Sequence, residues 1–129
     1  MEFEASSDYL LEMMDYIFKD LHGLDMEQKN KIQLACEEAL VNIISYAYPE
    51  GNGKIIIERQ NREKHLDVIL RDRGMPFNPM EVQCDIQVHA PIEERKIGRL
   101  GIFLMRQMAD DINYQRKNNE NVLHLKFRI

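Results

Sequence analysis

The 129-residue sequence has little cysteine, no long apolar run and no excess of positive charge. Cys36 and Cys84 form no CxxC pair, which favours reduced thiols in a cytoplasmic protein. The four histidines lack zinc-ligand spacing. No apolar run approaches the roughly 20 residues of a membrane helix, and the acidic, polar start does not resemble a signal peptide. A net charge of −5 argues against nucleic acid as a direct partner, because phosphate binding favours a basic face.

Several common nucleotide and hydrolase motifs are also missing from the sequence. It has no GxxxxGK[ST] phosphate loop, no Gly-rich loop with HRD and DFG, and no GxSxG elbow. A nucleotide bound by this chain must therefore be held by another design.

The spacing of apolar residues predicts a single domain over residues 1–129. Helices are expected at about 7–21, 26–48 and 100–109, and strands at about 2–5, 54–60, 65–72, 112–116 and 122–129. Residues 80–97 show no clean period, and such long loops are often lids or binding loops. The order predicts an α+β two-layer sandwich, with helices on one face of a mixed, largely antiparallel sheet.

The second expected helix contains the stretch ACEEALVNIISYAYP, residues 35–49, with no helix breaker before Pro49. Glu38 and Asn42 are four residues apart and therefore share one face of this helix. They lie beside its apolar stripe, at the margin of the expected core. A lone Glu/Asn pair is most often a solvated face, so this signal gains weight only from the rest of the chain.

Two glycine motifs supply that weight. Asp72 and Gly74 form an Asp-x-Gly at the end of a strand, and Gly98-Arg99-Leu100-Gly101 opens a helix. A Gly-x-x-Gly at a helix start suits phosphate, because free backbone N–H groups and the helix dipole both favour an anion. The aspartate could accept a hydrogen bond from an exocyclic amine such as that of adenine. Each motif alone is usually a turn or tight packing, but together they indicate a nucleotide.

At these residues the chain resembles the GHKL (Bergerat-fold) ATP-binding superfamily, and within it the bacterial anti-sigma-factor serine/threonine kinases. The helix motif Glu-x-x-x-Asn resembles residues 38–42, the first glycine box resembles RDRGMPFNP, and the second resembles GRLGIFLM. The likeness spans nearly the whole chain and implies the same two-layer histidine-kinase-like ATPase fold. It also implies ATP and Mg²⁺ as cofactors, with residues 80–97 as the ATP lid.

The resemblance implies a role for each matching residue. Asn42 would hold Mg²⁺ and Glu38 would be the catalytic base. Asp72 would contact the adenine amine, and Gly74 would pass under the base. The second box, with Gly98, Arg99, Leu100 and Gly101, would border the phosphates.

Three positions depart from the family's pattern. The family often has glycine at the position of Arg99, which could reach phosphate or point to solvent. Many members have histidine at the position of Tyr46, so the pocket could differ in shape. A threonine commonly precedes the last strand, but residues 117–121 offer only polar Asn and Glu residues besides Lys117, which puts one phosphate or adenine contact in doubt.

The favoured function is an ATP-dependent serine/threonine kinase that binds a regulatory protein, a sigma factor, and phosphorylates a serine on a small antagonist protein. The alternative is a partner-switch module that binds ATP and sequesters a regulatory protein without kinase activity. An ATPase module of a larger machine is less favoured, because the sequence shows no linker or dimerisation coiled coil. A homodimer is compatible with a sheet face that lacks cover, but no residue pattern specifies it.

Overall fold

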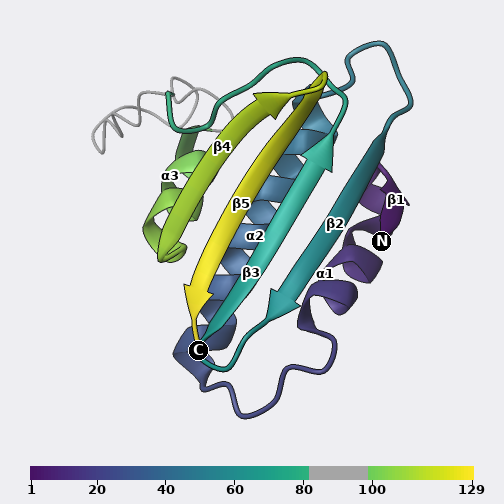
Figure 1. Cartoon of the computed structure of the whole chain (residues 1–129). Helices are drawn as coiled ribbons and strands as arrows, with labels where there is room; N and C mark the ends of the chain where they lie inside the picture. Colours follow the sequence, from purple (N-terminus) through teal and green to yellow (C-terminus); the bar gives the residue numbers. More distant parts are fainter. Residues whose placement is uncertain (82–98) are drawn as a thin grey trace, which may run out of the picture.

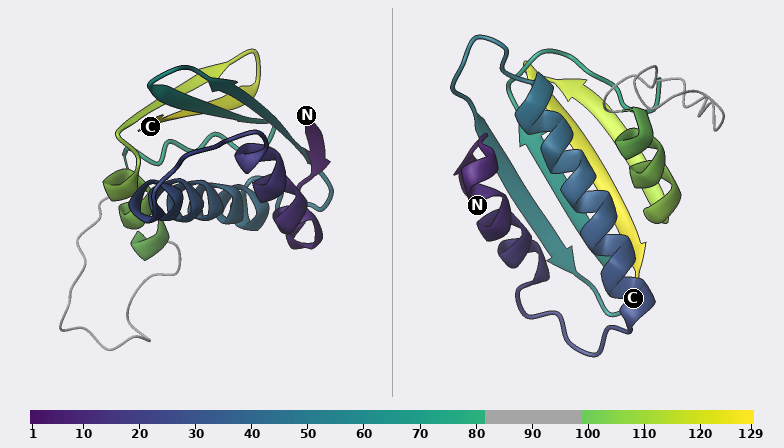
Figure 2. Two further views of the ribbon diagram at one scale, coloured as in Figure 1. Left: turned by 90° about the horizontal axis from the view of Figure 1, so that it is seen from below. Right: turned by 180° about the vertical axis from the view of Figure 1, so that it is seen from behind.

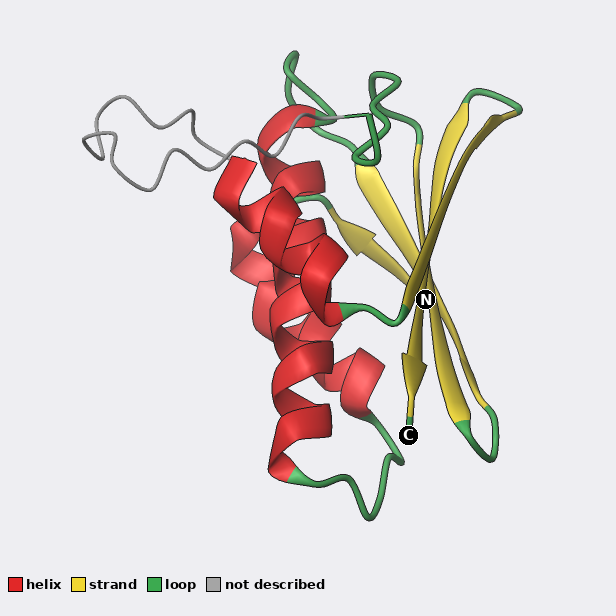
Figure 3. Cartoon of the chain, turned by 90° about the vertical axis from the view of Figure 1, so that its left-hand side faces the viewer, coloured by secondary structure: helices red, strands yellow, loops and turns green. Residues whose placement is uncertain are grey.

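The computed structural model describes residues 1–81 and 99–129, apart from the Arg99 side chain. A layer of helices lies against one face of a five-stranded sheet (Figures 1 and 3). The strands are β1 (Glu2–Glu4), β2 (Lys54–Asn61), β3 (His65–Asp72), β4 (Asp111–Lys117) and β5 (Glu120–Arg128). The helices are a 3₁₀ turn η1 (Ser7–Tyr9), α1 (Leu10–Phe18), α2 (Met26–Tyr46) and α3 (Arg99–Met108). This is the α+β two-layer architecture that the sequence predicts.

The strands are arranged in the order β1-β2-β3-β5-β4, and every pairing among them is antiparallel. Two of the pairs, β2–β3 and β4–β5, are hairpins formed by strands that the sequence predicts. The register places Asp72 at the end of β3 opposite Asn121 of β5, and Asn121 opposite Arg116 of β4. The ends of these strands therefore meet at one edge of the molecule.

Helix α2 runs along the middle of the helical layer, with α1 on one side and α3 on the other (Figure 2). Its start is fixed by a capping box, in which Asp25 accepts from the Gln28 N–H and the Gln28 side chain accepts from the Asp25 N–H. The apolar stripe is buried against the sheet, and its most deeply buried members are Ile32, Ala35, Cys36, Ala39 and Leu40. Burial raises the pKa of the Cys36 thiol, so this cysteine is an inert core residue.

The first two helices end earlier than predicted. Helix α1 stops at Phe18, because Lys19 is already extended and Asp20 has a left-handed φ of 60°. Helix α2 stops at Tyr46, and the carbonyl oxygen of its C-cap, Ala47, accepts a hydrogen bond of 2.9 Å from the Met75 N–H. A free carbonyl at the helix end is thus satisfied by the loop that follows β3.

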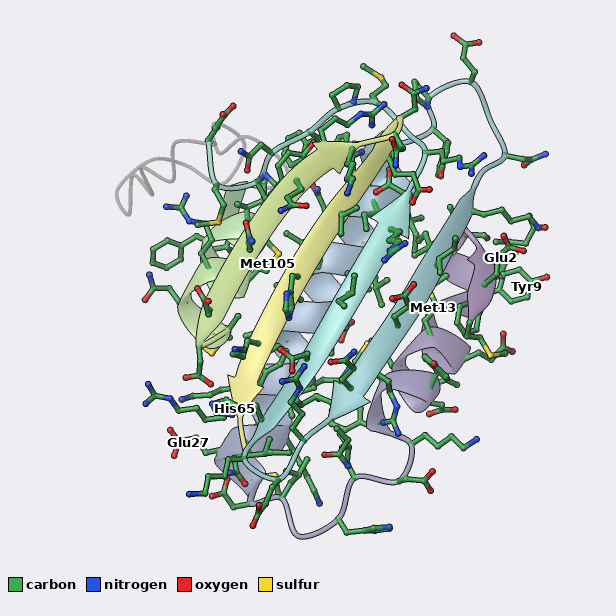
Figure 4. All side chains as sticks on the ribbon, viewed as in Figure 1. Glu2, Tyr9, Met13, Glu27, His65 and Met105 are labelled. Carbon is green, nitrogen blue, oxygen red and sulfur yellow. The ribbon has the colours of Figure 1, made fainter. Side chains whose placement is uncertain are left out.

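The core lies between the two layers. Met13 of α1 and Met105 of α3 fill its two flanks (Figure 4), and the inward residues of the central strands fill its middle. Burial alternates along β5, where Leu123, Leu125 and Phe127 are buried. None of the helices in the described ranges covers the opposite face of the sheet (Figure 3), and none is long and apolar enough to cross a membrane.

Candidate functional site

Two hollows lie beside the C-terminal half of α2. The inner hollow lies between α2 and the sheet, and its lining is mostly apolar: Ala39, Ile43, Ala47, Met75, Phe77, Pro79, Met105 and Leu123. Its polar lining comes from Asn42, Tyr46, Asp72, Tyr114 and Asn121. An apolar hollow with a few convergent polar groups is the usual form of a small-molecule site.

The outer hollow lies between α2 and α3. It is lined by Glu38, Val41, Asn42, Ser45 and Tyr46 of α2 and by Leu100, Gly101, Ile102 and Leu104 of α3. Asn42 and Tyr46 line both hollows, which therefore adjoin at one turn of α2. Four of the predicted site residues, Glu38, Asn42, Leu100 and Gly101, meet in the outer hollow, and the inner hollow adds Asp72.

Asp72 is buried at the end of β3, with 5% of its surface exposed. Its Oδ1 accepts hydrogen bonds from the Gly74 N–H at 2.9 Å and from the Asn121 amide at 2.9 Å. Burial raises the pKa of Asp72, while these two donors and the charge of Arg116 lower it in part. No described residue donates to Oδ2, so this oxygen is available to a ligand.

Gly74 lets the loop after β3 pass against the end of α2. A Cβ at this position would overlap the Cβ and the carbonyl oxygen of Ala47. The loop is also tied to β4, because Arg116 donates to the Gly74 carbonyl oxygen at 2.8 Å. The glycine is therefore needed for the close packing of this loop against the end of α2.

The Glu38 carboxylate lies half-buried beside α3. Burial, and to a lesser extent the charge of Glu37, raises the pKa of Glu38 above its ordinary value. A Cβ on Gly101 would overlap Oε2 of Glu38, so the glycine leaves room for this carboxylate at the start of α3. Glu38 makes no hydrogen bond or ion pair with the described parts of the chain.

The Asn42 amide is half-buried, and it too has no hydrogen-bond partner among residues 1–81 and 99–129. An amide oxygen is a hard ligand that suits Mg²⁺, which commonly takes phosphate oxygens and waters as its other ligands. The residues present thus fit a nucleotide with its metal: an apolar hollow with a carboxylate, an unpaired amide at the junction, and a carboxylate in the outer hollow.

Part of the predicted site falls outside the described residues. Gly98 lies there, as does the predicted lid except for Met80 and Glu81, and so does the Arg99 side chain. Arg99 begins α3, as the Gly-x-x-Gly pattern predicts for this stretch.

The sequence did not reveal Asn121, Tyr114 or Tyr48 as part of this region. Asn121 is 6% exposed and bonds to Asp72, and Tyr114 donates to the Asn121 Oδ1 at 2.5 Å. The Tyr48 hydroxyl donates to the Lys54 carbonyl oxygen and accepts from the Arg73 N–H. A signal for Asn121 was present, because it continues the inward alternation of β5, but the predicted strand began one residue later.

Known proteins resemble this chain over most of its length. The sequence profile of the histidine kinase-like ATPase domain matches residues 3–127. The chain is 27% identical over 108 residues to the serine-protein kinase RsbW of Bacillus mycoides (strain KBAB4), which covers 81% of this chain and 68% of that protein. It is 28% identical over 109 residues to the serine-protein kinase RsbW of Bacillus subtilis (strain 168), with the same coverage of both chains. The chain belongs to the histidine kinase-like ATPase domain family.

Proposed function

We propose that this protein is an ATP-dependent serine kinase of the anti-sigma-factor type, which binds a regulatory protein and phosphorylates a serine of its antagonist. One observation carries the proposal: the inner and outer hollows adjoin at Asn42, with Asp72 in the inner one and Glu38 in the outer one. The similarity to serine-protein kinases supports serine as the acceptor.

The inner hollow would hold the adenine base. Its apolar lining favours a flat, weakly hydrated ring, and Asp72 would accept a hydrogen bond from the exocyclic amine through Oδ2. A guanine carbonyl at the same place would face a carboxylate with no donor between them, so adenine is favoured over guanine.

The outer hollow would hold the phosphates and the reacting groups. The start of α3, with Gly98, Arg99, Leu100 and Gly101, would border the phosphates, and Asn42 would give its amide oxygen to Mg²⁺. Bound with the phosphates, Mg²⁺ supplies neutralisation of the negative charge that develops during transfer.

Glu38 would act as the general base. It takes the proton from the serine hydroxyl of the antagonist as the serine oxygen bonds to the γ-phosphorus, and ADP departs with the electrons of the broken bond. A pKa above the ordinary glutamate value makes Glu38 a better proton acceptor near neutral pH.

Nucleotide binding is tested by thermal melts with ATP and with ADP, each with and without Mg²⁺. A ligand at about 100 times its dissociation constant adds roughly 2.7 kcal/mol, which raises Tm by several degrees for a domain of this size. We expect Asn42→Ala to lose the Mg²⁺-dependent rise, whereas Asn113→Ala, an exposed asparagine of β4, keeps it. No rise for the wild type at millimolar nucleotide would contradict ATP binding.

Phosphotransfer is tested with γ-labelled ATP, Mg²⁺ and protein extract of the source organism, followed by identification of the labelled residue. Glu38→Gln should keep the melt shift but transfer at least about 100-fold more slowly, because the base is lost. Glu37→Gln removes the same charge one residue away and should transfer at nearly the wild-type rate. Equal transfer by Glu38→Gln and the wild type would refute the role of Glu38. ATP binding by the wild type without any transfer would favour the sequestering module instead.

A further inference from the structure

We propose that Asn121 is a positioning residue for base selection, whose amide orients the Asp72 carboxylate so that one oxygen alone is offered to the inner hollow. The inference rests on the proposed function, because it concerns the same nucleotide site.

Three polar side chains gather at the ends of neighbouring strands. Asp72 continues the inward face of β3 after Leu70, and Asn121 precedes Leu123 on the inward face of β5. The register places Asp72 and Asn121 directly opposite each other. Tyr114 of β4 reaches Asn121 from the next strand. At this edge, inward positions that would otherwise extend the apolar core carry three polar side chains joined by hydrogen bonds.

The orientation of the Asn121 amide is fixed by two backbone groups. The Phe77 N–H can only donate, and it lies 3.4 Å from Oδ1. The Met75 carbonyl oxygen can only accept, and it lies 2.8 Å from Nδ2. The second donor position of Nδ2 is directed to Oδ1 of Asp72, and Oδ1 of Asn121 also accepts from the Tyr114 hydroxyl. Two donors and two acceptor positions are therefore all in use.

Because its bonding capacity is full, Asn121 has no group left for a direct contact with the base. Its effect on a ligand passes through Asp72. The Asn121 amide and the Gly74 N–H both donate to Oδ1, which leaves Oδ2 without a donor among the described residues. Oδ2 keeps solvent contact, since the only fully enclosed side-chain polar atom without a hydrogen bond in these ranges is Nε of Arg71.

This arrangement makes a specific demand on the ligand. A base that donates from an exocyclic amine completes the set of bonds on Asp72, whereas a base without that amine leaves Oδ2 unpaired. If Asn121 acts by orienting Asp72, its loss must weaken the binding of ligands that carry the amine and leave the binding of ligands without it nearly unchanged. A merely structural role would weaken both alike.

The test compares two ligands, ATP and purine riboside 5′-triphosphate, which differs by the absence of the 6-amino group. Dissociation constants are measured by calorimetry for the wild type, Asn121→Ala, Tyr114→Phe and the exposed control Asn113→Ala. We expect Asn121→Ala to weaken the binding of ATP by about tenfold or more, in line with the loss of a hydrogen bond to a charged group. The binding of the analogue should weaken by less than about threefold. Tyr114→Phe should show the same selectivity with a smaller loss, and Asn113→Ala should match the wild type.

Each result has a distinct meaning. Equal weakening of ATP and the analogue by Asn121→Ala, in a protein that still melts cooperatively, would overturn the positioning role while leaving the nucleotide site intact. Failure of the wild type to bind either ligand would overturn the proposed function itself. If Asn121→Ala does not fold, Tyr114→Phe with the same two ligands decides, and an unselective loss there would equally overturn the proposal.

Discussion

At the scale of a single residue, the buried carboxylate of Asp72 lowers the stability of the fold at neutral pH. This carboxylate is buried, and burial raises its pKa above the ordinary aspartate value of 3.8. A raised pKa in the folded state means that ionisation disfavours folding. The contribution of Asp72 to stability is therefore greatest below pH 3.8 and is lost as the pH rises through the raised folded value.

Asp72→Asn should consequently be at least as stable as the wild type at pH 7, because it removes the buried charge and keeps an oxygen for the Gly74 and Asn121 donors. The advantage should disappear as the pH falls through the raised pKa. Urea unfolding at several pH values measures it, with the exposed Asp15→Asn as control. The variant should bind ATP at least about tenfold more weakly, because an amide N–H would face the adenine amine. A variant that is less stable at pH 7 than at pH 4, relative to wild type, would reverse this sign and refute the argument.

The sequence indicated Glu38, Asn42 and Asp72 as site residues because their signals are local: a helical spacing and a glycine two residues after an aspartate. Asn121 was overlooked because its partner lies 49 positions away, and only the pairing register of β3 with β5 brings the two together. Alternation along β5 contains the clue, but a polar residue at a strand end is usually a turn residue, and the register cannot be read from one strand.

At the scale of elements, the two described glycines of the site, Gly74 and Gly101, lie against different neighbours. A Cβ at Gly74 would overlap the carbonyl oxygen and Cβ of Ala47, the C-cap residue of α2. A Cβ at Gly101 would meet the end of the flexible Glu38 side chain. The same substitution should therefore affect stability at one position and chemistry at the other.

Gly74→Ala should lower the free energy of unfolding by about 1–3 kcal/mol, the usual range for overpacking. Gly101→Ala should change it by no more than about 0.5 kcal/mol, but it should displace Glu38 and slow phosphotransfer at least about tenfold. Urea unfolding and the labelled-ATP assay measure the two effects on the same protein preparations. If Gly74→Ala were as stable as the wild type, the contact with Ala47 would not require glycine. If Gly101→Ala transferred phosphate at the wild-type rate, the contact with Glu38 would not matter for the reaction.

Element boundaries were predicted well where a local signal marks them and less well elsewhere. Helix α2 begins at residue 26 as predicted, where Asp25 is the N-cap, and β3 spans His65 to Asp72 as predicted. Helix α1 ends at Phe18, three residues before the predicted end at residue 21. The actual stop is a left-handed Asp20, and aspartate gives only a weak signal for that conformation.

At the scale of the whole molecule, the proposed site joins α2, α3 and the ends of β3, β4 and β5, whereas α1 and β1 lie on the other side of α2 (Figure 2). ATP binding should therefore slow amide hydrogen exchange in two ways. Amides that exchange only through global unfolding should slow everywhere by a common factor, about 100 at 100 times the dissociation constant. Amides that exchange through local opening should slow only beside the site.

The backbone amides of Met75 and Phe77 report the site, because they bond to Ala47 and Asn121. The N–H of Lys19, at the end of α1, bonds to the Tyr16 carbonyl oxygen at 3.3 Å and reports local opening far from it. We expect Mg²⁺-ATP to slow Met75 and Phe77 and leave Lys19 unchanged, with no effect in Asn42→Ala. If Lys19 slowed as much as Met75, ATP would tighten the molecule as one unit, and a site confined to one side of α2 would be wrong. A second outcome would also contradict the proposal: slower exchange at Met75 and Phe77 without slower exchange at the most protected amides of β3. It would mean that ATP binds the unfolded chain as well as the folded one. A pocket built from three strands and two helices exists only in the folded chain, so this outcome would exclude it as the binding site.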